Sequence, residues 1–357
     1  MGALGWLAGD SLTSNGTANA ALYDQRLALN WVYKNIHLFG GDPHRVTVMG
    51  ESAGGGSILH QITAYGGNGG PSPFQQAILQ SPGWYPLPDE DQQESTLQQF
   101  LGHLNVSTVE QARKLPSQKL VEANAYQVAT KSPYGTYTYG PVVDGTFVPQ
   151  MPGLLLNEGN FDKNLRVMVG HNADEGLLFT PPNSANSKDY RSLLKQDFPD
   201  IKPNMSNYIS NVLYPPVYNG TYGYTTPVER FALTLADVVF QCNTDYLNRA
   251  YNGQTYAYMF SIPPALHGYD LSYTFYNPNE NSSSSVANKT VALALQDYIT
   301  SFTQSGSPNS TIGSAFQKSG AQRHLQNLGA SNISSIHDPT ANRRCRFWQN
   351  VPYFQPS

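Results

Sequence analysis

The chain has 357 residues, enough for one large hydrophobic core or two domains. Hydrophobic residues make up 39% of it and charged residues only 13%, and the net charge is −4. There is no basic patch to predict nucleic-acid binding and no apolar run as long as a membrane span, so we expect a soluble globular protein.

The first helical pattern covers residues 22–38. Apolar side chains recur there at the spacing of one helix face, at Leu29, Val32, Tyr33 and Ile36. Further helices are predicted over residues 89–128, over 226–239 with an end at 240–242, and over 291–302. Residues 181–224 are rich in Pro, Asn, Ser and Tyr and read as cap or loop. The region after 305 is expected to be irregular.

The next element is a strand that runs into a glycine-rich turn. Residues 45–49 are mostly apolar, as in a strand buried on both faces, and Gly50-Glu51-Ser52-Ala53-Gly54 follows, which fits G-x-S-x-G. Such a turn strains its central residue, and glycines without a Cβ at 50 and 54 leave room for the backbones. The helix after it aims its N-terminus at the serine, where negative charge develops in acyl transfer. Ser52 is therefore the predicted nucleophile; the alternative is an incidental serine in a glycine-rich turn.

Three further strands are predicted over residues 74–80, 165–170 and 255–262, which are apolar or aromatic. Polar residues follow each of them: Ser81, then His171-Asn172-Ala173-Asp174-Glu175, then His267. Doubly wound sheets place functional groups just past the carboxyl ends of their strands. Asp174 and Glu175 are therefore candidates for the site, whereas His171 is expected to be structural and a loop histidine is the alternative for His267.

Two segments carry a family resemblance. Phe39-Gly40-Gly41, followed after four residues by Val46 to Gly54, resembles the serine signature of the type-B carboxylesterases, which include cholinesterases and fungal secreted lipases. The resemblance runs from Gly2 to about Trp348. It implies an α/β-hydrolase fold, with a mostly parallel sheet flanked by helices and the helix at 22–38 covering the sheet beside the nucleophile strand. It also implies one domain over residues 1–357, with cap-like insertions around 84–135 and 181–225.

The resemblance implies a catalytic triad of Ser52, Glu175 and His267, in the chain order of this fold. Asp174 is the alternative acid, although an offset of one residue turns its side chain away. Glu51 and Ser81 are expected to support the site from behind; for Ser81, a turn serine is the alternative. The implied reaction is hydrolysis of a small-molecule ester or lipid through an acyl-enzyme, with no metal or organic cofactor.

The family resemblance predicts an incomplete oxyanion hole in this chain. The N–H of Ala53 is one donor, but the His-Gly-Gly-Gly type loop that supplies the others in the family does not occur in the sequence. Residues 2–7 resemble the segment after the fourth strand, so we expect the N-terminal strands and the oxyanion loop to be missing and the strand at 45–49 to be an exposed edge. The loss could abolish activity, so a non-catalytic, cholinesterase-like binding protein is the second hypothesis.

Several features favour an extracellular protein, although residues 1–9 have no cationic start typical of a secretory signal. Eight N-x-S/T glycosylation sites occur, at Asn15, Asn105, Asn204, Asn219, Asn281, Asn288, Asn309 and Asn332. Cys242 and Cys345 are the only cysteines, too few for a zinc site. Cys345-Arg346-Phe347-Trp348 resembles the Cys-x-Phe-Trp of cholinesterases, which implies a disulfide with Cys242; two buried thiols are the alternative.

Overall fold

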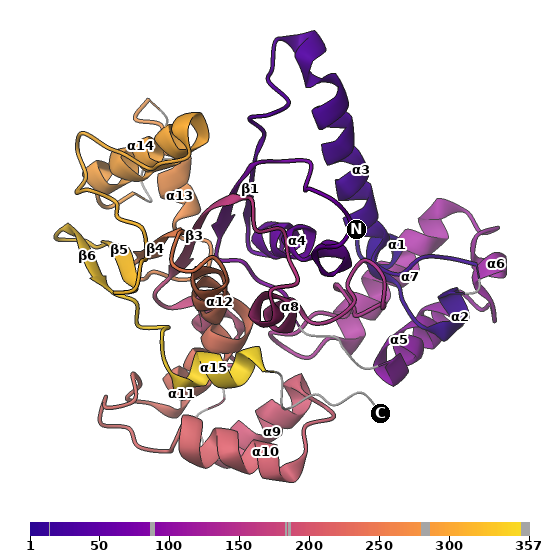
Figure 1. Cartoon of the computed structure of the whole chain (residues 1–357). Helices are drawn as coiled ribbons and strands as arrows, with labels where there is room; N and C mark the ends of the chain where they lie inside the picture. Colours follow the sequence, from indigo (N-terminus) through magenta and orange to yellow (C-terminus); the bar gives the residue numbers. More distant parts are fainter. Residues whose placement is uncertain (14, 86–89, 183, 185–186, 280–285, 351–357) are drawn as a thin grey trace.

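The computed structural model describes residues 1–13, 15–85, 90–182, 184, 187–279 and 286–350. Its centre is a six-stranded sheet flanked by helices (Figure 1). Four of these strands were predicted, and the sheet with flanking helices is the arrangement that the resemblance implied. The strands lie in chain order: β1 Thr47–Glu51, β2 Gln76–Gln80, β3 Arg166–Asn172, β4 Tyr256–Phe260, β5 His324–Leu328 and β6 Ile333–His337. The first five pair in parallel, and β6 is antiparallel to β5.

The strand register brings the functional end of the sheet together. Glu51 lies opposite Gln80, Gln80 opposite Gly170, and Gly170 opposite Tyr258. The carboxyl ends of the first four strands therefore lie side by side at the same end of the sheet. Parallel pairing forces this arrangement, because every carboxyl end then points the same way. The residues that follow β1, β2 and β3 therefore start from neighbouring strands at the same end of the sheet.

Alternating side chains on the strands divide the core in two. On one face, Ala77, Leu79 and Val169 pack with α4 (Ala53–Ile62), α8 (Pro152–Glu158) and α12 (Cys242–Ala250). On the other face, Ile78 and Met168 pack with α13 (Leu271–Thr274) and α14 (Lys289–Ser305). β2 is buried along its whole length and β3 is buried from Val167 onward, as their apolar runs predicted.

β1 is the exception, because it lies at the end of the sheet and pairs only with β2 among the described strands. The residues of β1 are half-buried, and the side chain of Met49 is exposed. The exposed edge strand that the family resemblance implied is therefore found, whereas the prediction that this strand is buried on both faces is wrong. α3 (Ala20–Asn35) packs against α1 (Ala3–Trp6) and α4, and its Leu29 lies against the same core cluster as Val48 of β1. The C-terminal half of α3 stands apart from the sheet in Figure 1, so the helix covers the sheet only in part.

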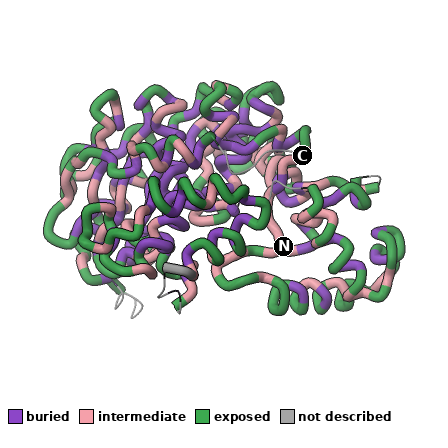
Figure 2. The backbone as a smooth tube through the Cα atoms, turned by 90° about the horizontal axis from the view of Figure 1, so that it is seen from below, coloured by how far each residue is buried: buried purple, intermediate pink, exposed green. Residues whose placement is uncertain are grey.

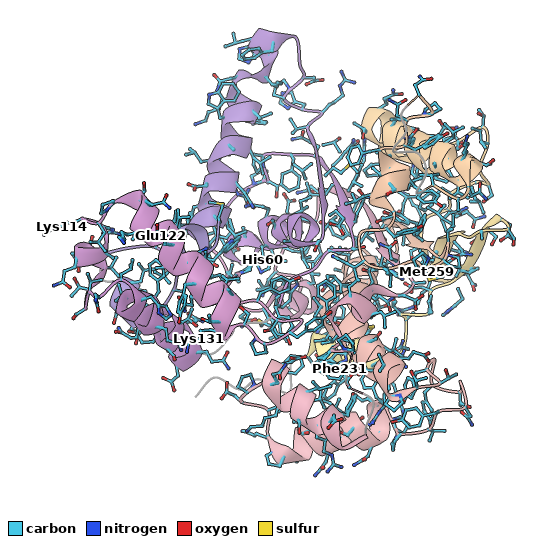
Figure 3. All side chains as sticks on the ribbon, turned by 180° about the vertical axis from the view of Figure 1, so that it is seen from behind. His60, Lys114, Glu122, Lys131, Phe231 and Met259 are labelled. Atoms are coloured by element: carbon cyan, nitrogen blue, oxygen red, sulfur yellow. A yellow bond between two sulfur atoms is a disulfide. The ribbon has the colours of Figure 1, made fainter. Side chains whose placement is uncertain are left out.

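Two helical groups lie outside the sheet layers (Figure 1). The first contains α2 (Asp10–Thr13), α5 (Glu90–His103), α6 (Val109–Ala112) and α7 (Ser117–Lys131), and has small apolar clusters of its own. The second contains α9 (Ser187–Asp197), α10 (Pro203–Tyr208), η4 (Ile209–Leu213) and α11 (Pro227–Leu235). Figure 2 shows the buried residues mainly in the interior of the molecule, and Figure 3 labels the charged Lys114, Glu122 and Lys131 on the first group.

The structure corrects two predicted boundaries. The helix expected to end at residues 240–242 continues through a π-helical turn, η5 (Ala236–Gln241), into α12 and ends at Ala250. No Gly or Pro interrupts residues 236–252, and buried apolar side chains hold this segment against the sheet. The region after 305 is not irregular throughout, because it contains β5, β6 and α15 (Arg343–Gln349).

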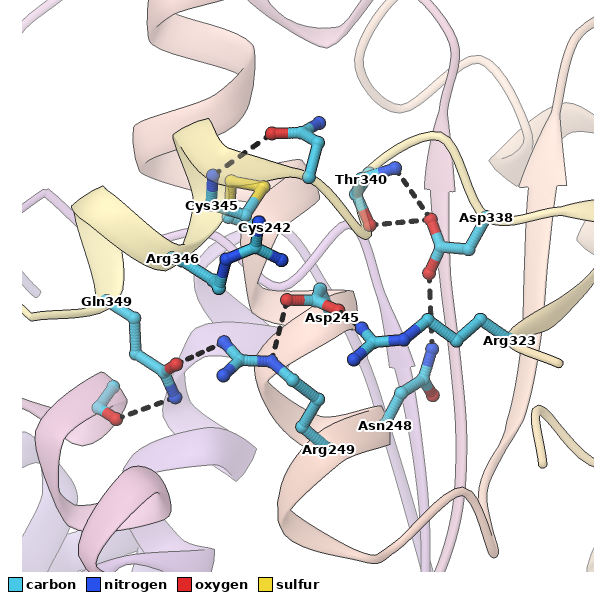
Figure 4. Close-up of polar contacts among 12 residues, drawn as sticks. Cys242, Asp245, Asn248, Arg249, Arg323, Asp338, Thr340, Cys345, Arg346 and Gln349 are labelled. Carbon is cyan, nitrogen blue, oxygen red and sulfur yellow. Dashed lines mark hydrogen bonds and ion pairs between the residues drawn. A yellow bond between two sulfur atoms is a disulfide. The ribbon is translucent and has the colours of Figure 1, made fainter. Parts of the chain in front are cut away.

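The C-terminal helix α15 is joined to the body by a disulfide between Cys242 and Cys345, as the resemblance implied. Figure 4 shows this bond beside a buried carboxylate, Asp245, whose oxygens are paired with Arg249 and Arg323. Arg249 also donates a hydrogen bond to Gln349. None of the described helices is both long and apolar enough to span a membrane.

Candidate active site

Ser52 occupies the tight turn between β1 and α4. Its backbone has φ 56° and ψ −120°, a conformation that residues other than glycine rarely adopt. Strained backbone of this kind is often found at functional sites. The turn is fixed on both sides, since the Ser52 N–H donates to the Gln80 carbonyl and the Ser52 carbonyl accepts from the N–H groups of Gly56 and Gly83. Ser52 is therefore presented at the carboxyl edge of the sheet.

The glycines of this turn have different roles. A Cβ at Gly50 would lie 2.5 Å from the carbonyl carbon of Gly54, so the space predicted at Gly50 is needed. A Cβ at Gly54 would have no atom of the described residues within 4 Å. The prediction that a glycine at position 54 leaves room for a close backbone approach is therefore wrong. The second close approach lies two residues later, where a Cβ at Gly56 would be 2.1 Å from the Gly83 carbonyl oxygen.

His267 lies in the loop after β4, which runs beside the segment after β3 through a parallel bridge between Leu266 and Asp174. The Nε2 atom of His267 is 2.7 Å from the Oγ of Ser52, a distance suited to a hydrogen bond and to proton transfer. These two residues are 215 positions apart in the chain, and the sheet register brings them together.

Glu175 completes this group of side chains. Its Oε2 is 2.5 Å from Nδ1 of His267, and its Oε1 accepts a hydrogen bond from the backbone N–H of Asn172. The side chain is fully buried, so it has no competing contact with solvent. Glu175, and not the neighbouring Asp174, contacts the imidazole, and His171 lies apart from it with Nδ1 against Thr244.

The surroundings of His267 favour its protonated form. Burial lowers the pKa of this imidazole, but the hydrogen bond and charge of Glu175, together with the charge of Glu51, outweigh burial and raise the pKa above its ordinary value. The ring also packs against Phe240 and Phe179, with ring centroids 4.2 and 5.2 Å from its own. The ring is thus held in one orientation, with its two nitrogens directed at different partners.

Glu51 lies beside His267 as well. Its Oε1 is 3.4 Å from Nε2 of His267 and makes no hydrogen bond with the described residues. Burial raises the pKa of Glu51 to about 7. The carboxyl group therefore changes charge near neutral pH, within reach of the imidazole.

Ser81 belongs to a buried polar network behind these residues and does not touch Ser52 or His267. Its Oγ accepts a hydrogen bond from the Asn172 side chain, which also donates to Asp270. Asp270 accepts two more bonds, from Tyr258 and Gln80. The sequence analysis gave Asn172 no role and missed Asp270, although Asn172 stands at the end of β3 and Asp270 is three residues beyond His267.

A cavity of about 200 Å³ opens beside Ser52. Ala53, the first residue of α4, lines it, and its N–H belongs to the first helical turn, which has no intrahelical acceptor. Six of the fourteen residues that line it are aromatic: Trp6, Trp84, Tyr85, Tyr137, Tyr139 and Phe240. The arrangement thus combines a serine–histidine–carboxylate chain with free N–H groups and an apolar cavity.

Comparisons with known proteins agree with this arrangement. Over residues 1–348 the chain matches the profile of the carboxylesterase family. It is 40% identical to carboxylesterase patB of Penicillium expansum over 355 residues, an alignment that covers 99% of this chain. It is 30% identical to a secreted lipase of Arthroderma benhamiae over 315 residues, which cover 87% of this chain. The chain spans 63% of the length of the first relative and 58% of that of the second.

The solved structure of EstA from Aspergillus niger superposes with a TM-score of 0.85 at 25% identity, covering 98% of this chain and 72% of that protein. A second esterase structure, PNB esterase, gives a TM-score of 0.77 at 23% identity and covers 98% of this chain. Fold and sequence thus lead to the same assignment: this chain belongs to the carboxylesterase family.

Proposed function

We propose that the protein hydrolyses carboxylic esters through an acyl-enzyme, with Ser52 as nucleophile, His267 as general base and acid, and Glu175 as the residue that orients and stabilises the imidazole. The observation that supports this most is the continuous hydrogen-bonded chain from Ser52 Oγ through both nitrogens of His267 to Glu175. Family membership and the 40% identity to a carboxylesterase favour the same reaction class.

In this proposal Oγ of Ser52 attacks the ester carbonyl while Nε2 of His267 takes its proton. The imidazolium that forms is stabilised by Glu175, and its proton then passes to the leaving alkoxide. Water repeats these steps on the acyl-enzyme and releases the acid. The N–H of Ala53 donates to the carbonyl oxygen as it becomes negative, helped by the positive end of α4.

A fluorophosphonate reagent is expected to label the protein once per chain, at Ser52. The reagent needs an activated serine, and the contact with His267 supplies the base. Intact mass and peptide mapping measure the adduct. The Ser52→Ala variant should stay unlabelled, and Ser117→Ala, which changes an exposed serine at the start of α7 that does not line the cavity, should be labelled as fast as the parent. Labelling that survives Ser52→Ala would reject the proposed nucleophile.

Replacing Glu51 by glutamine is expected to stabilise the protein at alkaline pH. The folded-state pKa of Glu51, about 7, exceeds the ordinary value of 4.5, so the folded protein holds its proton more tightly. Its contribution to stability is complete below pH 4.5 and is lost as the pH rises through 7. We expect Glu51→Gln to raise the unfolding free energy by about 1 to 2 kcal/mol at pH 8, allowing for solvent screening, and to leave it unchanged at pH 4.

Urea unfolding at both pH values measures this difference, and an equal effect at the two would contradict the raised pKa. Glu51→Gln should also move the acid limb of kcat/KM to lower pH, because the Glu51 charge is one of the groups that raise the pKa of His267.

An extracellular setting is part of the proposal. The disulfide favours an oxidising compartment, and a secreted lipase is among the relatives. Of the eight glycosylation motifs, Asn281 lies outside the described residues, Asn288 is half-buried at the start of α14, and the other six asparagines are exposed. Protein isolated from its source with two free thiols would contradict this compartment.

A further inference from the structure

The first helical group (α2, α5, α6 and α7) and α1 enclose a groove of about 610 Å³. Its volume lies in the range of about 300 to 1,000 Å³ that is usual for ligand sites. None of the residues that line the groove also lines the cavity beside Ser52. The groove is therefore a candidate site in its own right, independent of the proposed ester hydrolysis.

The wall of the groove is apolar, and part of it is uncovered. Twelve of its fifteen lining residues are aliphatic, aromatic or glycine. They come from two separate small clusters of buried side chains, with Leu12 and Leu101 in one and Ala3 and Phe100 in the other. Leu4, which also lines the groove, is 61% exposed. Protein interiors are normally close-packed, so a gap between two apolar clusters leaves apolar surface in contact with water.

Arg113 is the one charged residue that lines the groove within the described part of the chain. It is exposed, directly follows α6, and donates one hydrogen bond of 2.6 Å to the Asn15 carbonyl. Its other N–H groups make no hydrogen bond or ion pair with the described residues. Glu110, three residues earlier, accepts a hydrogen bond from the Asn15 side chain instead. The guanidinium can therefore hold a carboxylate through two parallel hydrogen bonds.

We propose that this groove binds a free fatty acid, with the alkyl chain between the two apolar clusters and the carboxylate on Arg113. A fatty acid satisfies both features of the groove, because its chain covers the apolar wall and its head group supplies the missing negative charge. A neutral lipid or an apolar peptide helix would cover the wall but leave Arg113 without a counter-charge. In Figure 1, α6 lies at the outer edge of the first helical group, so the head group would be at the solvent side.

Isothermal titration calorimetry on the full chain tests the proposal with decanoate, octanoate and decan-1-ol, each used as a monomer. Decanoate is expected to bind once per chain and about tenfold more tightly than decan-1-ol, which lacks the charge. Octanoate should bind about tenfold more weakly than decanoate, because two fewer methylene groups leave water. Absence of decanoate binding, or equal affinities for decanoate and decan-1-ol, would overturn the proposal.

The role of the cation is tested with Arg113→Gln. The variant is expected to lose about tenfold in affinity for decanoate and to bind decan-1-ol as the parent does. Lys114→Gln is the matched control, since it removes the same charge from the neighbouring exposed residue, which does not line the groove (labelled in Figure 3). It should bind decanoate as the parent does. An Arg113→Gln protein with the parent's affinity for decanoate would contradict the assigned head-group site.

The position of the alkyl chain is tested with Leu4→Glu, which places a negative charge in the groove. This variant is expected to bind decanoate more than about tenfold more weakly, because a carboxylate in an apolar wall opposes both the chain and the head group. Leu27→Glu is its control, since Leu27 is a similarly exposed leucine, at 69%, on α3 outside the groove. Circular dichroism and melting establish that both variants fold. Unchanged decanoate binding by folded Leu4→Glu would place the ligand elsewhere and reject the proposal.

Discussion

Replacing His267 by alanine is expected to lower kcat for ester hydrolysis by about 10⁵-fold or more, because the base that lies 2.7 Å from the Ser52 hydroxyl is removed. The Ser52 proton then has no acceptor during attack, and the leaving alkoxide has no donor. Glu175→Gln should cost about 10⁴-fold, since the imidazole stays in place but its charged form is no longer stabilised. Initial rates on a chromogenic aryl acetate measure both effects.

His37→Ala is the matched control, because His37 is an exposed histidine at the start of η1 (Ile36–Phe39) with no contact to the site. It should keep the parent rate. Fluorophosphonate labelling should slow in parallel with hydrolysis in the His267 and Glu175 variants. A His267→Ala protein that folds and retains more than a tenth of the parent kcat would exclude the proposed base.

Removing the disulfide with Cys242→Ala and Cys345→Ala together is expected to lower the unfolding free energy by about 4 to 5 kcal/mol at most. The two cysteines are 103 residues apart, and closing so long a loop restricts the unfolded chain strongly. The bond also holds α15 beside Asp245 and its two arginines (Figure 4), so its loss should loosen the C-terminal region first. Equilibrium urea unfolding gives the difference.

Reductant supplies the control for this prediction. It should destabilise the parent protein by a similar amount and leave the double variant unchanged. Parent and variant with equal midpoints in the absence of reductant would show that the disulfide does not constrain the unfolded chain as argued.

Local sequence was sufficient to identify the elements of the fold that repeat a simple pattern. The central strands were recognisable because both of their faces are buried, which requires apolar runs such as residues 167–170. The turn at Ser52 was recognisable because its geometry needs a glycine at 50. Helices such as α14 showed their apolar stripe. The segment at 236–250 was misjudged because its helical backbone depends on burial against the sheet and not on a local end signal.

The sequence and its family resemblance identified Ser52, Glu175 and His267 separately. Each follows an apolar strand and has a side chain that can take part in acyl transfer. Only folding could bring them to hydrogen-bonding distance, because contact across 215 residues depends on how four parallel strands align their ends. The support from Asn172 and Asp270, the unpaired oxygen of Glu51 and the size of the cavity likewise come from packing between distant segments, which no spacing along one chain records.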